Sequence, residues 1–141
     1  MVGPKGSLKM SILGPVRPET QIEISKTETR TLGIDAPLRM SADLEGTPGC
    51  KIIGPKGEIT VDKGVIVAKR HAHFTPDDAK VFGVTDGQAI QIKLDYNGRS
   101  LIFGDVIARV SKTAGLAVHI DTDEANAAGL TGTVDGEAII G

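Results

Sequence analysis

Apolar and polar residues alternate along several short segments of the chain, and a period of two predicts β-strands. In residues 88–94, Ile90, Ile92 and Leu94 share one face, and most of the other positions are polar. Residues 21–25 repeat this pattern with two isoleucines between polar side chains. Further extended segments are expected at residues 7–13, 65–68, 100–103, 106–110 and 116–120, with an edge strand at 137–140.

Turn sequences separate these segments. Gly-Pro-Lys-Gly occurs at residues 3–6 and again at 54–57, and such a sequence is typical of a hairpin turn. The repeat indicates either two similar turns or two related β units that divide near Ala68. Asn97-Gly98 predicts a further two-residue hairpin turn.

Two short helices are expected in the second half of the chain. Thr75 and Asp78 have the spacing of a capping box, and Gly83 ends that helix. Asp121 begins a second helix that Gly129 closes. Because both helix starts carry their own acidic residues, their N-termini are poor sites for phosphate.

Together with these elements, the composition indicates the fold class. The chain has 141 residues, 40% of them apolar but none of them Trp, so its core must be built from aliphatic side chains. Eighteen Gly and seven Pro are spread along the whole chain, as expected for many strands joined by tight turns. We therefore predict a mainly β fold of two small β-barrels with short helices. The first barrel spans residues 1–68 and the second residues 69–141.

Charge and cysteine content exclude several classes of function. The net charge is −2 and aromatic residues are scarce, which gives no reason to expect nucleic acid or an anionic membrane as partner. No apolar run is long enough to span a bilayer or to serve as a signal peptide, so a cytoplasmic protein is expected. The single cysteine, Cys50, is expected in a loop and is a poor candidate nucleophile.

All three histidines lie in two strand-like segments. His71 and His73 follow the apolar run at residues 65–68, and side chains two apart on a strand share a face. If the fold brings His119 alongside, three neutral imidazoles would form an open zinc site of the catalytic type. The alternative is a histidine pair on a strand that binds no metal.

Candidate anion sites lie among the arginines, since the helix N-termini are occupied. Arg17, Arg70 and Arg109 are the candidates. Gln21 and Glu23 alternate on one polar face, which is either solvated surface or the wall of a site. The chain has no nucleotide-binding loop and no serine-hydrolase motif, so neither chemistry is supported.

Three segments resemble signature stretches of the phosphate propanoyltransferase family, phosphotransacylases associated with bacterial microcompartments: GVIVAKRHAHFTPDDAKVFGV, VHIDTDEANAAGL and LGPVRPETQIEISKTETRTLGIDAP. The resemblance covers residues 2–130. It implies a pair of small β-barrels and the transfer of a short acyl group between coenzyme A and inorganic phosphate at a two-zinc site.

The resemblance also implies metal ligands. It puts His71, His73 and His119 on one zinc and makes Glu23 the carboxylate ligand of the second. Family members carry an earlier Arg-His-x-His segment that supplies further ligands, and this chain begins after it. The second barrel is therefore expected to be incomplete: it is open, closed by the glycine-rich tail, or completed by another chain.

Substrate roles are implied in the same way. Residues expected to hold phosphate are Arg17, Gln21 and Arg109. Residues expected near coenzyme A are Leu13, His119 and Asn126. In the expected chemistry the zinc polarises the thioester carbonyl or holds phosphate, and arginines neutralise charge.

The expected function is conversion of acyl-CoA and phosphate, propanoyl or acetyl, to acyl phosphate and coenzyme A. The rival is a non-catalytic zinc-binding or assembly module. A cupin-type metal enzyme is disfavoured because the helix expected at Thr75 follows directly after His73. A homo-oligomer and microcompartment association are both open alternatives.

Overall fold

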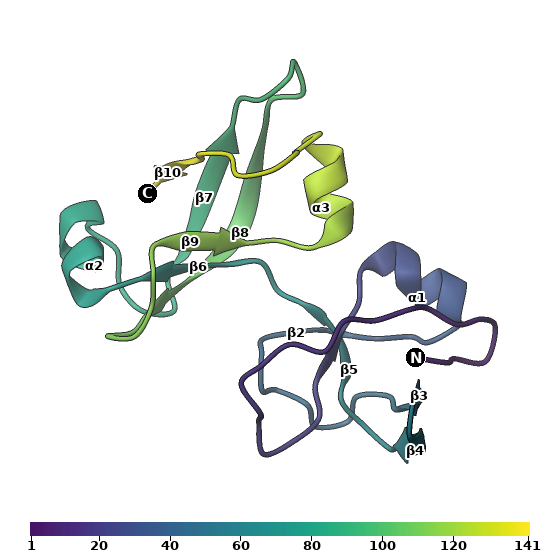
Figure 1. Ribbon diagram of the computed structural model, residues 1–141. Coiled ribbons are helices and arrows are strands. Elements are labelled where there is room, and N and C mark those ends of the chain that lie inside the picture. Colours follow the sequence, from purple (N-terminus) through teal and green to yellow (C-terminus); the bar gives the residue numbers. More distant parts are fainter. The chain divides into compact units, whose positions relative to one another are not determined.

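The computed structural model describes residues 1–141 and divides them into two compact units, Met1–Ala68 and Lys69–Gly141 (Figure 1). Ten strands and three short helices make up the regular structure. The predicted mainly β class is therefore confirmed. That each unit forms an independent domain stays a prediction.

The first unit is built around a central strand. Its elements are β1 (Ile22–Glu23), α1 (Lys26–Leu32), β2 (Leu38–Arg39), β3 (Cys50–Gly54), β4 (Gly57–Val61) and β5 (Val65–Ala68). β5 lies between β1 and β2 and is parallel to both, while β3 and β4 form a separate hairpin. Val65 and Val67 are buried together with Leu32 of α1. A strand that is buried along its length needs a continuous apolar sequence, and β5 has one.

Helix α1 was not expected from the sequence. Ser25 caps it: its hydroxyl accepts a hydrogen bond from the Glu28 amide, while the Glu28 carboxylate accepts one from the Ser25 amide. The expected extended segment at residues 21–25 is therefore only partly right. Strand β1 contains two of these residues, and Ser25 starts a helix instead of continuing the polar face. The Ser-x-x-Glu spacing was the available signal.

The two Gly-Pro-Lys-Gly turns are confirmed. The Gly3 amide donates to the Gly6 carbonyl at 2.8 Å, and Gly54 pairs with Gly57 across the β3–β4 turn. Two other expectations for this unit are wrong. Residues 7–13 form no strand beyond an isolated bridge at Ser7, and Cys50 lies in β3, buried, instead of in a loop.

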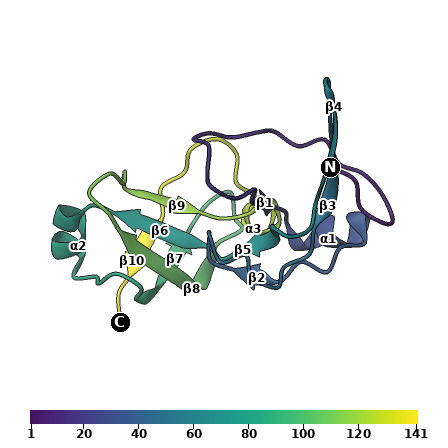
Figure 2. The same ribbon diagram turned by 90° about the horizontal axis from the view of Figure 1, so that it is seen from below.

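The second unit contains one five-stranded sheet. Its elements are β6 (His71–Phe74), α2 (Pro76–Phe82), β7 (Ala89–Leu94), β8 (Leu101–Val110), β9 (Ala117–His119), α3 (Thr122–Ala127) and β10 (Glu137–Ile139). The strand order is β10-β7-β8-β6-β9, and both views show β9 beside β6 (Figure 2). Because β9 and β10 do not pair with each other, the sheet is open, and the tail adds the edge strand expected of it.

Strand β7 has the expected alternation. Ile90, Ile92 and Leu94 are buried, and the residues between them are exposed. These three side chains form a core with Phe74 of β6 and Val106 of β8. This core supports the strand that carries two of the histidines.

Strand β8 is continuous where two strands were expected, at residues 100–103 and 106–110. Gly104 and Asp105 lie opposite the single residue Gln91, which is a β-bulge. Asp105 takes a positive φ of 52° at this point. The glycine that indicated a break between strands is thus part of an irregularity within one strand.

Both expected helices are confirmed. Helix α2 begins at its Thr75 cap and ends at Gly83, which takes a left-handed conformation. Helix α3 begins at its Asp121 cap. None of the helices has the length and apolar character needed to cross a membrane.

The cap of α2 makes stability depend on pH. The Thr75 hydroxyl and amide donate to the Asp78 carboxylate at 2.7 and 3.0 Å, and these hydrogen bonds lower the pKa of Asp78. A lowered pKa adds stability at pH values above the ordinary one, and this stability is lost as pH falls through the lowered pKa.

We therefore predict that Asp78→Ala lowers the melting temperature near neutral pH and that the difference from wild type narrows as the pH falls toward about pH 2. Asp77→Ala is the control because Asp77 is exposed and not part of the capping box. A difference that stays constant between the two pH values would contradict the prediction. Thermal unfolding followed by circular dichroism measures it.

Candidate functional site

Strands β6 and β9 bring the three histidines together. His71 and His73 alternate with the buried Ala72 and Phe74, so both imidazoles lie on the face of β6 opposite the core. β9 runs antiparallel to β6 with His119 directly opposite His71. The sequence-based condition that the fold bring His119 alongside is met.

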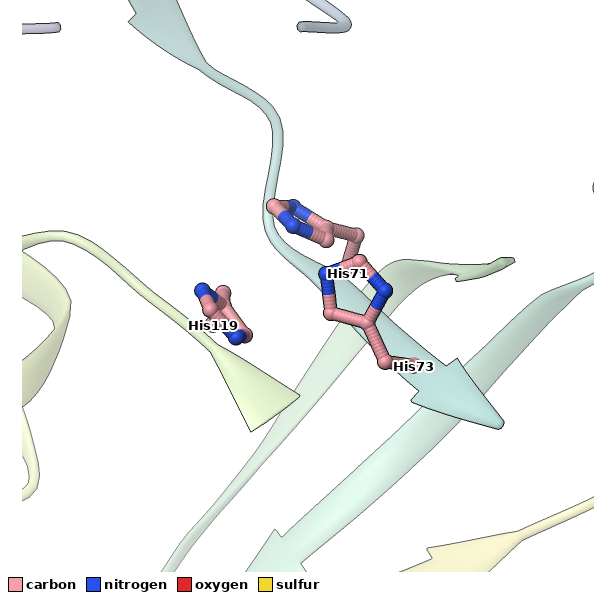
Figure 3. Close-up of side chains that lie close together, drawn as sticks. All are labelled: His71, His73 and His119. Carbon is pink, nitrogen blue, oxygen red and sulfur yellow. The ribbon is translucent and has the colours of Figure 1, made fainter. Parts of the chain in front are cut away.

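The three rings face one another across a small space (Figure 3). The ring centroids of His71 and His73, and of His71 and His119, are 4.9 Å apart, and those of His73 and His119 are 4.8 Å apart. The candidate ligand nitrogens all lie within 4.8 Å of one another. Imidazole nitrogens bind zinc at about 2.0–2.1 Å, so modest ring rotations would bring all three onto one ion.

A backbone contact orients His71. Its Nδ1 lies 2.9 Å from the Lys69 carbonyl oxygen, which can only accept a hydrogen bond. In the neutral imidazole, this contact puts the hydrogen on Nδ1 and leaves the lone pair on Nε2. A contact of this kind commonly fixes the tautomer and orientation of a metal-binding histidine.

The surroundings of His73 favour its neutral form. Burial lowers its pKa below the usual histidine value, and the neighbouring His71, His119 and Arg109 lower it further. Neutral imidazole is the form that binds a metal ion. The residues present thus fit a zinc ion in donor type and spacing.

Arg109 lies next to this cluster. β6 and β8 run parallel, and their register puts Arg109 beside His73. Arg109 is partly buried, and its charge is close enough to influence the His73 imidazole. A cation beside three imidazoles can attract an anion.

Arg70, the third candidate for holding an anion, has partners within the second unit. Its guanidinium lies 3.3 Å from the Glu124 carboxylate and stacks over the Phe103 ring at 5.2 Å. This charge is committed to an interaction inside the second unit. Asn126, expected near coenzyme A, is exposed on α3.

The first unit holds a second polar cluster. The Gln21 side-chain amide donates to Glu23 at 2.6 Å and to the Ser41 hydroxyl at 3.0 Å. Arg17 donates to the same hydroxyl at 2.8 Å. Three predicted site residues are therefore connected by hydrogen bonds through Ser41 and Gln21. Leu13 is 85% exposed.

Ser41 is a member of this cluster that sequence reasoning missed. It lies 20 positions beyond Gln21, and no motif marks it. The next residue, Ala42, has a left-handed backbone with φ of 77°, and its amide donates to the Gln21 side-chain carbonyl at 2.8 Å. Gln21 therefore forms hydrogen bonds to Glu23, to Ser41 and to the backbone of the turn that contains Ser41.

The structure thus gathers the predicted residues into two groups. His71, His73, His119 and Arg109 meet in the second unit. Arg17, Gln21 and Glu23 meet in the first.

Three converging imidazoles are a donor set that suits a zinc ion with an open fourth position. A sequence model of the phosphate propanoyltransferase family matches residues 1–131, and the chain belongs to this family.

Curated relatives agree with the family match. The chain is 55% identical over 130 residues to a phosphate propanoyltransferase of Citrobacter rodentium, which covers 92% of the chain and 62% of the relative. It is 52% identical over 129 residues to a phosphate propanoyltransferase of Thermotoga maritima, covering 91% of the chain and 61% of the relative. The chain therefore spans less than two thirds of the length of the relatives it matches.

Replacing Gln21 tests the cluster of the first unit. Gln21→Leu removes the acceptor of the Ala42 amide, and the loss of one net hydrogen bond, about 1 kcal/mol, should speed hydrogen exchange of that amide about fivefold. Gln88→Leu is the control, since Gln88 accepts from Thr85 in the second unit. Unchanged exchange of Ala42 in Gln21→Leu, followed by NMR, would show that this contact does not hold the turn.

Proposed function

We propose that this chain takes part in the transfer of a short acyl group, propanoyl or acetyl, between coenzyme A and inorganic phosphate. The observation that supports it is the three-imidazole cluster beside Arg109, in a chain of the phosphate propanoyltransferase family. The proposed substrates are acyl-CoA and phosphate. A bacterial cytoplasmic location, free or within a microcompartment, is part of the proposal and rests on the family.

The proposed metal is zinc. His71, His73 and His119 would hold it, leaving a fourth position open. When bound, zinc supplies a Lewis acid that polarises a carbonyl or phosphoryl oxygen. Glu23 is proposed as a ligand of a second zinc, in the cluster of the first unit.

Phosphate binding is proposed for three residues. Arg109 offers its charge beside the imidazoles. In the first unit, Arg17 and Gln21 offer donors that are oriented through Ser41. Guanidinium groups suit phosphate because they donate in a planar, two-pronged geometry.

The proposed reaction is a direct displacement. A phosphate oxygen attacks the carbonyl carbon of the thioester, the carbon–sulfur bond breaks, and the thiolate of coenzyme A leaves and takes up a proton. No protein nucleophile is required. Burial raises the pKa of the only thiol, Cys50, which keeps it protonated and unreactive.

Coenzyme A is proposed to bind near Leu13, His119 and Asn126. Leu13 and Asn126 are both exposed, so an apolar side chain and an amide are available to a large ligand.

Metal binding tests the first part of the proposal. His73→Ala should lower zinc affinity about 100-fold or more, because loss of a direct ligand exceeds the effect of losing a residue that supports one. Cys50→Ser is the control and should bind zinc like the wild type. Titration against a chromophoric chelator measures both. Equal affinity in His73→Ala and wild type would exclude the three-histidine site.

An assay of catalytic activity tests the second part of the proposal, the acyl transfer itself. With zinc, propanoyl-CoA and phosphate, we expect release of free thiol, and Arg109→Gln should lower kcat/KM about 100-fold because a stabilising charge is lost. Arg39→Gln is the control, since Arg39 pairs with Asp43 on the surface. Undiminished activity of Arg109→Gln would contradict its role. Zinc binding with neither turnover nor coenzyme A binding would identify the chain as a non-catalytic module.

A further inference from the structure

Packing alone does not hold the segment that carries His119. β9 contains three exposed residues at the edge of the sheet. The following helix, α3, has six residues, and none of them is buried. The apolar attachments of the segment are Ile120 and Leu130, which pack against the core, and the buried Ala128. The ladder with β6 covers only three residue pairs, so polar contacts at its ends can add to the fixation of His119.

The Glu124 carboxylate supplies such a contact. One of its oxygens accepts a hydrogen bond from the Asp121 amide at 2.9 Å, and the other lies 3.3 Å from the Arg70 guanidinium. Asp121 is two residues after His119, and Arg70 immediately precedes His71. A single carboxylate thus joins the two strands that carry the histidines, close to the pair at which His119 and His71 face each other.

Arg70 is itself anchored to the sheet. Its guanidinium stacks over the ring of Phe103 in β8, and its carbonyl accepts a hydrogen bond from the Ile107 amide at 3.2 Å. The side chains of Arg70 and Glu124 are 28% and 22% exposed, so water screens this ion pair less than a surface pair. The pair therefore links the Asp121 backbone to a side chain that is itself attached to β8.

A second arginine holds the other end of α3. The Nε of Arg99 donates to the Ala127 carbonyl oxygen at 3.0 Å. The helix after His119 is thus fastened at both ends by arginines of the second unit. The Arg70 contact lies closer to the histidine.

We propose that Arg70 and Glu124 are positioning residues that fix His119 relative to His71 and His73. They hold β9 in register and thereby set the spacing of the three imidazoles. The inference rests on the proposed function insofar as those imidazoles bind zinc. Its structural part concerns the metal-free protein and is tested separately.

Two variants of the full chain remove this contact with little other change. Arg70→Met keeps an unbranched side chain over Phe103 but removes the charge. Glu124→Gln keeps an oxygen that can accept from the Asp121 amide, since glutamine also serves in a capping box. Lys93→Met and Glu137→Gln are the matched controls, because Lys93 and Glu137 form an ion pair elsewhere in the same sheet.

Two measurements are made on each variant: zinc affinity by chelator competition, and hydrogen exchange of the β9 amides in the metal-free chain. Arg70→Met and Glu124→Gln should each lower zinc affinity about tenfold, and the double variant should lose no more than either single one. Their β9 amides should exchange faster, while β7 is unchanged. The two control variants should resemble the wild type in both measurements.

Unchanged β9 exchange in both variants would overturn the positioning role. Faster exchange with unchanged zinc affinity would also overturn it, because the contact would then not set the ligand geometry. A wild-type chain that binds no zinc would contradict the proposed function instead, and the amide exchange would still decide whether Arg70 and Glu124 fix β9.

Discussion

The antiparallel pairing of β6 with β9 places His71 directly opposite His119. Side chains alternate between the faces of a strand, so a shift of β9 by one residue would turn His119 to the opposite face of the sheet. The ring spacings of 4.8–4.9 Å, the lowered pKa of His73 and the place of Arg109 beside the cluster all depend on strand register. The core side chains of β7 and β8 pack against the buried face of β6, whereas β9 is held to β6 by only a short ladder of backbone hydrogen bonds.

Local chemistry explains what the sequence could predict. His71 and His73 share a face because they are two apart on a strand, and Thr75 with Asp78 gives a readable helix start. Long-range contacts explain what it could not. The pairing of Arg70 with Glu124 spans 54 positions in the chain, and Ser41 meets Gln21 across 20 positions, so neither partner is visible in a local pattern.

Two errors have local causes. Gly104 interrupts an apolar run and indicates the end of a strand, but the chain accommodates it as a bulge within β8. The alternation at residues 21–25 predicts a strand through Ser25, although Ser25 and Glu28 have the spacing of a capping box. In the first case strand pairing overrides the local break signal of a glycine, and in the second the capping-box spacing predicts the structure better than the alternation does.

We propose that His71, His73 and His119 bind one zinc ion. X-ray absorption at the zinc edge of the zinc-loaded chain tests this binding, because it reports the ligand atoms themselves. We expect about three imidazole nitrogens at about 2.0–2.1 Å and one further light ligand. A sulfur ligand at about 2.3 Å, or a shell of oxygen atoms without imidazole, would contradict it.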